Sequence, residues 1–199
     1  MKLQIITSFL VVSILAGGYL WFVLENTPEE SGEDGEVVDN NYISSKQEVP
    51  DHWQLYQSSQ FNFTLQYPPE GSVVVEAEQV KITYLGPDNT MGSEITDGFT
   101  FFVDSVEGDG RTLAEYVNSQ FIEESRDLVI ISEPVRLRAH ERDAYSYQLE
   151  TRLGPSVTHV VLETGGDYFF TIRYMVAGEN RRGYEEYIDL IIKSLQIDE

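Results

Sequence analysis

Twenty-two consecutive residues, Leu3 to Leu24, carry no formal charge, and few polar side chains interrupt them. A helix of this length would measure roughly 33 Å at about 1.5 Å per residue, enough to cross a hydrocarbon core of about 30 Å. Tyr19, Trp21 and Phe22, near its far end, are aromatic types that suit a membrane interface. We therefore predict that residues 1–24 form a transmembrane signal anchor.

The charges on either side of this segment give it a direction. Lys2 and the N-terminal amine precede it, whereas Glu25, Glu29 and Glu30 follow it. Because positively charged flanks stay on the cytoplasmic side, we expect a single-pass protein of the cell membrane with a cytoplasmic N-terminus. Residues 25–199 would then be extracytoplasmic.

A cleaved secretory signal is the alternative, because Ala16-Gly17-Gly18 offers the small residues that a signal peptidase needs. Cleavage after Gly18 would leave the apolar run 19–24 at the head of the mature protein, which an uncleaved anchor avoids. The same residues also look like a lipobox in which Gly18 replaces the cysteine. Since the chain contains no cysteine, lipidation at this position, disulfides, thiolate zinc sites and cysteine nucleophiles are excluded.

Residues 25–51 carry nine acidic side chains and one lysine, a net charge of −8, and few large apolar groups. Such a segment cannot bury enough surface to offset the entropy of ordering, so we predict a disordered and extended acidic linker. Its carboxylates also allow a weak calcium site or a contact with a cationic partner, although the fixed spacing of an EF-hand loop is absent.

Residues 52–199 are numerous enough to form one globular domain, and they carry 25 acidic and 11 basic side chains. The whole chain has a net charge of −21. This charge argues against a nucleic-acid partner, because proteins that bind nucleic acids need a basic surface to replace the counterions on phosphate.

Short strands dominate the pattern of this domain. From Phe61 to Tyr67 apolar and polar residues alternate strictly, as in a strand with one buried face, and Pro68-Pro69 ends the run. The sequence Thr164-Gly165-Gly166-Asp167 separates two later strands, and because glycine permits the positive φ of a tight hairpin, antiparallel pairing is expected. The expected strands cover residues 61–67, 72–75, 80–85, 98–103, 128–131, 135–139, 144–150, 157–163 and 168–175.

Two amphipathic helices are expected among these strands. The first begins at Thr112, whose hydroxyl can cap the helix while Glu115 closes a capping box. The second covers residues 183–196, in which apolar side chains recur at helical spacing. The predicted class is therefore α+β, with an antiparallel sheet flanked by helices.

Several features follow one another in a set order between residues 56 and 197. An aromatic-rich strand ends in Tyr67-Pro68, a helix starts with Thr-Leu-x-Glu at 112–115, an aromatic strand covers 142–147, and the last helix ends in Lys193-Ser194-Leu195. In this order the chain resembles the PsbP-like domain, an α/β/α sandwich named for an extrinsic subunit of photosystem II and shared by bacterial envelope proteins. The resemblance implies that fold and an accessory or binding role, and it assigns no ligand residue to this chain.

The sequence lacks the motifs of common enzyme classes. No nucleophile elbow occurs, and His140-Glu141 begins like a zincin motif but has no second histidine one turn later. The segment Gly108-Asp109-Gly110-Arg111 lacks the lysine and hydroxyl of a phosphate-binding loop. We therefore predict no catalytic residue, no cofactor and no metal.

The three histidines are candidate metal ligands. His159 and Glu163 share one face of an expected strand, but their backbones would be about 13 Å apart, so a third group would have to lie between them. His52 lies near the linker and His140 in a charged turn. We expect all three histidines on the surface or partly buried instead.

Basic and aromatic residues gather in the second half of the domain. Arg136 and Arg138 alternate along one strand face, and Tyr145 and Tyr147 follow on the next strand. We predict a candidate interaction surface from these four residues, since tyrosine and arginine are favoured at interfaces. The alternative is that the arginines pair with neighbouring carboxylates and the tyrosines fill the core.

These features together predict a membrane-anchored, extracytoplasmic, non-catalytic module that binds or helps to assemble an envelope protein. Its contact with the membrane would be made by residues 3–24. The alternatives are a small-ligand-binding protein or an enzyme with a dispersed site, and a purely structural envelope protein. A deep pocket with convergent polar groups would favour the small-ligand reading, and a flat or filled surface would favour a protein partner.

Overall fold

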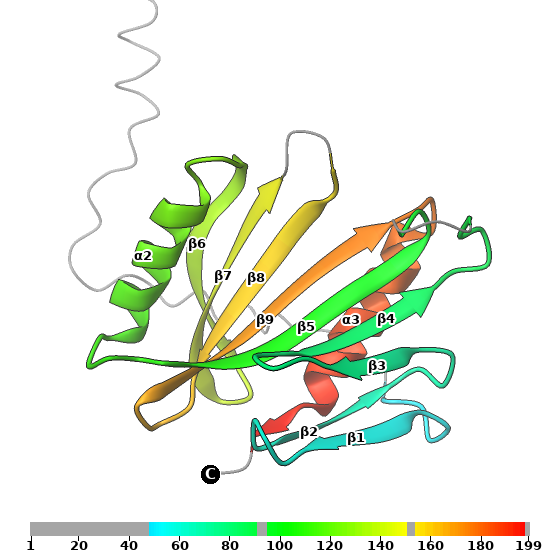
Figure 1. The fold of residues 1–199 in the computed structure, drawn as a ribbon, viewed down its shortest axis with the longest axis horizontal. Coiled ribbons are helices and arrows are strands. Elements are labelled where there is room, and N and C mark those ends of the chain that lie inside the picture. The colour runs from blue at the N-terminus through cyan, green and yellow to red at the C-terminus, as the bar shows by residue number, and fades with distance from the viewer. Residues whose placement is uncertain (1–47, 91–94, 151–153, 198–199) are drawn as a thin grey trace, which may run out of the picture. The chain divides into compact units, whose positions relative to one another are not determined.

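The computed structural model describes residues 48–90, 95–150 and 154–197, which are mostly β-sheet (Figure 1). The predicted transmembrane helix within residues 1–24 and nearly all of the predicted linker, residues 25–51, lie outside the described residues. Among the residues that are described, no helix is both long enough and apolar enough to cross a membrane.

The strands in these ranges form two sheets, and every neighbouring pair within them is antiparallel, as predicted. The larger sheet has the order β3-β4-β5-β9-β8-β7-β6, and the smaller has the order β1-β2-β10. The larger sheet consists of β3 (Ser72–Val75), β4 (Val80–Leu85), β5 (Gly98–Glu107), β6 (Val129–Ala139), β7 (Arg142–Glu150), β8 (Ser156–Glu163) and β9 (Tyr168–Ala177). The smaller consists of β1 (Gln54–Ser58), β2 (Phe63–Tyr67) and β10 (Gln196–Ile197).

Two helices in the described residues cover opposite faces of the larger sheet. Helix α2 (Leu113–Glu124) contacts β6, β7 and β8, whereas α3 (Arg181–Ser194) contacts β5, β9 and β2. Adjacent strand residues point to opposite faces, and accordingly Val161 packs in the cluster under α2 while its neighbour Val160 packs in the cluster under α3. The predicted α+β class, an antiparallel sheet flanked by helices, is thus confirmed for this part of the chain.

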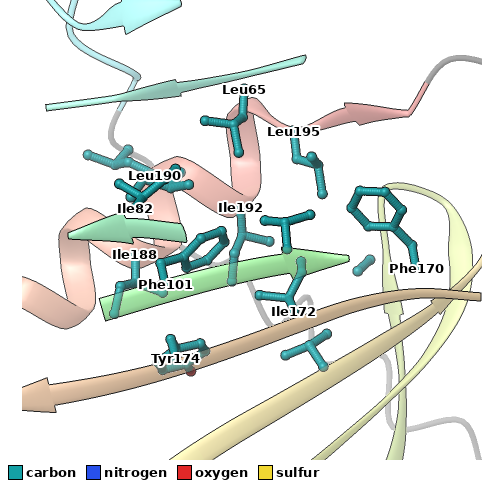
Figure 2. Packing of buried hydrophobic residues seen from close by; sticks show 14 of the residues in the cluster. Leu65, Ile82, Phe101, Phe170, Ile172, Tyr174, Ile188, Leu190, Ile192 and Leu195 are labelled. Carbon is teal, nitrogen blue, oxygen red and sulfur yellow. The ribbon is translucent and has the colours of Figure 1, made fainter. Parts of the chain in front are cut away.

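The main hydrophobic core lies between the larger sheet, α3 and the smaller sheet (Figure 2). Figure 2 shows Ile192 of α3 lying between Leu65 of β2 and β5, and Ile188 of α3 beside Phe101 of β5, and all four side chains are buried. Burying one such side chain contributes about 1.5 to 3 kcal/mol, so the stability of the domain is concentrated on this face. The face toward α2 carries a smaller apolar cluster and, beside it, polar groups.

The strand predictions differ from the structure at β1, at β6 and at β10, whose first residue, Gln196, was expected to end the last helix. Strand β1 was not predicted, because its side chains lack the alternation that marks a half-buried strand and four of its five residues are not buried. The two expected strands 128–131 and 135–139 are one strand, β6, whose pairing with β7 shifts register between Ile130 and Val135. Pro134 lies in this irregular stretch, and β6 is an edge strand, where a missing N–H donor is tolerated.

The predicted capping box at the start of α2 is confirmed. The Thr112 hydroxyl accepts a hydrogen bond from the backbone N–H of Glu115 at 3.3 Å, and Glu115 Oε2 accepts one from the backbone N–H of Thr112 at 2.8 Å. Two N–H groups that the helix itself cannot pair are thereby satisfied.

Replacing Thr112 by alanine should lower the free energy of unfolding by about 1 kcal/mol, because the cap acceptor is lost. Thr112→Ser keeps the hydroxyl and should stay close to the wild type. Urea unfolding of the full chain, followed by circular dichroism, measures both variants. Equal destabilisation by alanine and serine would show that the threonine methyl group, and not the cap, is what matters.

Candidate functional site

A cavity of about 170 Å³ lies between α2 and the larger sheet. Its lining comes from β5, α2, β7, β8 and β9 and is unusually rich in ionisable groups. The lining residues are Asp104, Val106, Tyr116, Gln120, Glu124, Tyr147, His159, Val161, Thr171, Ile172 and Arg173. Asp104 and Arg173 also line an adjoining hollow of about 410 Å³, whose other walls are residues 76–79 between β3 and β4. The two hollows therefore meet at this pair of residues.

The pairing register of three strands places the central side chains in one row. Tyr147 of β7 is paired with His159 of β8, and His159 with Arg173 of β9. Two residues along β9, Thr171 is paired with Asp104 of β5, so it faces the same side of the sheet as Arg173. Five residues from four strands are thus brought under α2.

An ion pair links β9 to β5 at the junction of the two hollows. Arg173 donates to Asp104 Oδ2 at 3.0 Å and to Gln79 Oε1 at 2.8 Å, and the Thr171 hydroxyl donates to the other oxygen of Asp104. Burial raises the pKa of Asp104, while the hydrogen bond from Thr171 and the charge of Arg173 act in the opposite direction. Asp104 is therefore a partly desolvated carboxyl whose charge depends on its partners.

A second carboxyl, that of Glu124, enters the cavity from the last turn of α2. The Tyr147 hydroxyl donates to Glu124 Oε2 at 3.0 Å. Burial raises the pKa of Glu124, with the Tyr147 hydrogen bond opposing, and burial together with the nearby Glu124 charge raises the pKa of Tyr147. Tyr147 therefore stays protonated and acts as the donor in this pair.

His159 lies next to Glu124 on one side and is paired with Arg173 on the other, and it is 7% exposed. Its ring stacks on that of Tyr147 with centroids 4.5 Å apart, and its Nε2 lies 3.5 Å from Glu124 Oε2. Burial, helped by the charge of Arg173, lowers the pKa of His159 from 6.5 to about 4. The imidazole is therefore neutral at neutral pH.

Phe102 forms an aromatic platform at the edge of this row. The Arg173 guanidinium lies 5.6 Å from the centroid of the Phe102 ring, and the Lys81 ammonium lies 5.8 Å from it. The cluster as a whole gathers several groups with shifted pKa values in one hollow, which is a common property of functional sites. Among the described residues, no group of three or more histidine, aspartate or glutamate side chains is arranged to hold a metal ion.

A larger hollow, about 610 Å³, lies at the opposite side of the fold beside Asp97 and Tyr184. The Asp97 carboxylate there accepts a hydrogen bond from the Tyr184 hydroxyl at 2.8 Å and one from the backbone N–H of Asp88 at 3.0 Å. These bonds join α3 to the β4–β5 connection, so the polar groups are explained by the fold. The cavity under α2 is the better candidate site.

The four residues of the predicted interaction surface lie on neighbouring strands but are not equally accessible. Arg136 is exposed and donates to Asp143 at 3.0 Å, and Arg138 is exposed and donates to the carbonyl oxygen of Glu141 at 3.1 Å. Tyr145 is half-buried, and Tyr147 is 2% exposed and lines the cavity. Tyr147 therefore belongs to the interior of the site, and a role of the other three in an interface stays a prediction.

One of the three histidines, His159, is more buried than expected. His52 and His140 are exposed, and His140 Nε2 lies 2.7 Å from the carbonyl oxygen of Ile192 in the last turn of α3. The expectation that His159 is at most partly buried was wrong. Its neighbour in space is Glu124 of α2, while Glu163 is exposed and does not line the cavity.

Asp104, Glu124, Thr171 and Arg173 were missed as site residues. The available signal was a charged side chain inside an apolar strand pattern: Asp104 follows Phe101-Phe102-Val103, and Arg173 lies within the run from Phe169 to Tyr174. A charge at such a position is rarely buried without a partner. The signal indicates that a partner exists, but it does not say which residue the partner is.

No protein-family model and no curated protein sequence matches the chain. Solved structures do match, among them the solution structure of cyanobacterial PsbP from Synechocystis, with 12% sequence identity and a TM-score of 0.49 over 73% of this chain and 92% of that one. A protein of unknown function from Pseudomonas aeruginosa matches with 15% identity and a TM-score of 0.42, over 67% of this chain and 89% of that one. The described domain is thus similar to PsbP in its fold, as the resemblance in the sequence implied, and this similarity concerns the fold alone.

Proposed function

We propose that this chain is a non-catalytic binding module, held at the outer face of a cell membrane, whose site for a small ligand is the cavity under α2. The observation that carries the proposal is the convergence of Asp104, Glu124, His159 and Arg173 on one hollow between a helix and a sheet. A flat or filled surface would have favoured a protein partner as the main ligand. The cavity therefore adds a small-molecule site to the binding module that the sequence predicts.

The size of the site supports a small ligand. Ligand pockets typically enclose about 300 to 1,000 Å³ and combine apolar walls with a few placed polar groups. The cavity of about 170 Å³ is smaller than this range by itself, but it meets the adjoining hollow of about 410 Å³ at Asp104 and Arg173. Val106 and Val161 supply its apolar wall.

The state of the polar groups supports binding in preference to catalysis. The lining contains neither cysteine nor lysine, and its threonine hydroxyl, that of Thr171, is directed at Asp104. His159, with its pKa lowered to about 4, is poorly matched to a general base at neutral pH. These groups can orient a ligand by hydrogen bonds without reacting with it.

The membrane position rests on the sequence. The uncharged segment Leu3–Leu24 would anchor the chain in the membrane, and the acidic segment 25–51 would let the domain extend away from the membrane surface. Alkaline extraction of membranes that carry the full chain, together with protease access from the outer side, tests this part. Release of the chain by alkali, or protection of the domain from external protease, would contradict it.

The binding role can be tested with a library of small polar compounds and the thermal unfolding of the full chain in lipid nanodiscs. Gln120→Trp places a large side chain at the cavity wall, and Asn118→Trp places the same side chain on an exposed position of α2. At least one compound should raise the unfolding temperature of the wild type and of Asn118→Trp but not that of Gln120→Trp. A library without any hit, or hits that stabilise all three chains equally, would overturn the proposal.

An exposed apolar edge favours a second role, the binding of an envelope protein partner. Strand β6 is an edge of the larger sheet, and Val129, Ile130, Ile131 and Val135 on it are each about half exposed. An unpaired strand edge with apolar side chains is a surface to which another strand can add. A photo-crosslinker at Ile130 in the membrane-held chain should capture one defined partner, and Val135→Lys should abolish that capture.

A further inference from the structure

Three neighbouring side chains of the cavity lining, those of Glu124, His159 and Tyr147, each offer a hydrogen-bond acceptor. Glu124 presents a carboxyl group, and a neutral imidazole such as His159 always has one ring nitrogen with a free lone pair. The Tyr147 hydroxyl uses its proton on Glu124, which leaves its oxygen as an acceptor too. A ligand with several donors on one atom can therefore bond to all three side chains.

The charges around the two hollows also favour a ligand that is a hydrogen-bond donor. Arg173 is already paired with Asp104 at 3.0 Å. Glu124, in contrast, has no arginine or lysine nitrogen within ion-pair distance in the described ranges. The charge of Arg173 reaches it only from farther away, as a minor influence that lowers its pKa, and the ionisable group in contact with it is the neutral His159. Glu76 and Glu78 add two carboxyl groups to the adjoining hollow, against which Lys81 near Phe102 is one further cation. Carboxyl groups thus outnumber the cations around the two hollows.

His159 provides an observation that is independent of the carboxyl groups. The residue is 7% exposed, and its ring makes no hydrogen bond to another group in the part of the chain that the structure describes. Its contact with Glu124, at 3.5 Å from Nε2 to Oε2, is too long for a good one. A buried polar group without a partner is unfavourable, so a ligand that makes a hydrogen bond to this ring would stabilise it.

We propose that the cavity binds a small organic cation, a primary ammonium group on a short aliphatic stem. The ammonium donates to Glu124, to the free ring nitrogen of His159 and to the hydroxyl oxygen of Tyr147. The stem lies against the apolar wall formed by Val106 and Val161. The inference rests on the proposed function, because it names the ligand class of the same site.

The test uses three probes that share a four-carbon stem and differ in the head group: butylamine, 1-butanol and butyrate. Binding to the full chain in lipid nanodiscs is followed at neutral pH through the methyl resonances of Val106 and Val161, which report on the cavity and not on the lipid. Butylammonium should shift these resonances with an affinity at least tenfold higher than that of butanol or butyrate. Glu124→Gln should weaken butylammonium at least tenfold, whereas Glu123→Gln, its exposed neighbour on α2, should not.

Each other outcome has a definite meaning. If butyrate or butanol binds as tightly as butylammonium at the same methyl groups, the proposal of an organic cation is overturned, and the binding role stays intact. No shift with any of the three probes would also overturn the cation, and the library experiment above then decides the binding role separately. Should Glu124→Gln fail to fold, His159→Phe keeps the ring and removes the acceptor nitrogen, and an unchanged affinity for butylammonium in that variant would overturn the inference.

Discussion

Replacing Arg173 by methionine should lower the free energy of unfolding by about 2 kcal/mol. The substitution leaves the Asp104 side chain, 12% exposed, without its cationic partner, and only the Thr171 hydroxyl then remains to stabilise its charge. Breaking a fully buried pair in this way is unfavourable by about 3 to 5 kcal/mol. The smaller value applies here because the Arg173 side chain is 39% exposed, so water already weakens the pair.

A double-mutant cycle separates the unpaired carboxylate from the lost packing of the arginine on Phe102. Asp104→Asn alone should be milder, because the partly exposed guanidinium can turn to water and still contact Gln79. Combining Asp104→Asn with Arg173→Met removes both charges, and the double variant should be more stable than Arg173→Met alone. If the two single effects simply add in urea unfolding, Arg173 stabilises the fold by its contact area and not by its charge.

Local patterns predicted much of the fold because they depend on neighbouring residues. The alternation from Phe61 to Tyr67 identified β2, and the glycines after Thr164 identified the β8–β9 hairpin, in which Gly165 has a φ of 84°. The capping box at Thr112 fixed the start of α2 within one residue. Short-range hydrogen bonds and side-chain periodicity determine each of these features, and both can be read from a single sequence.

The short elements at the edges could not be predicted in the same way. Strand β10 has two residues and exists because Gln196 and Ile197 pair with Thr64 and Phe63, more than 130 residues earlier. Strand β6 continues through Pro134 because it lies at an edge of the sheet, and the strand order is not visible in the sequence. Both features follow from tertiary contacts, which override local preference.

The candidate site was beyond sequence reasoning for a related reason. The acid that approaches His159 is Glu124, and their proximity depends on which face of the sheet α2 covers and on the rotation of that helix. Likewise Arg173 and Asp104 are 69 residues apart and meet only because β9 lies next to β5. The expected partner of His159, Glu163, was chosen from spacing along one strand, where spacing says nothing of other elements.

Strand β9 contributes one face to the main hydrophobic core and the other face to the cavity under α2. Ile172 and Phe170 face α3 and belong to the main core, whereas Thr171 and Arg173 face α2 and belong to the polar row. A shift of pairing by one residue would place the arginine in the apolar core. The burial of Ile172 and Phe170 therefore fixes the position of Arg173, and the geometry of the site depends on the core behind it.

Between pH 7 and pH 4 the wild-type chain should lose about 3 kcal/mol of unfolding free energy relative to a His159→Phe variant. Burial and the charge of Arg173 lower the pKa of His159 from 6.5 to about 4 in the folded chain. Above pH 6.5 the imidazole is neutral in both states, so its contribution is fully present. As the pH falls from 6.5 toward 4, the unfolded chain takes up a proton that the folded chain refuses, and stability is lost.

The comparison with a variant is needed because other groups titrate in the opposite direction. Burial raises the pKa values of Asp104 and Glu124, and burial with nearby glutamates raises that of Asp189 to about 6. These carboxyl groups take up protons more readily in the folded chain, so they add stability as the pH falls. They are present in both proteins, and their contributions largely cancel in the difference.

A second non-titrating side chain distinguishes the proton from the shape of the ring. His159→Gln loses the stacking on Tyr147, so its stability at pH 7 will differ from that of His159→Phe. Its difference from the wild type should nevertheless change with pH by the same amount, because both variants remove the same titration. Urea unfolding at half-unit steps from pH 7 to pH 4 gives both curves. Parallel curves for the wild type and both variants would mean that His159 is as easily protonated in the folded chain as in the unfolded one, and hence that water reaches its ring in the cavity.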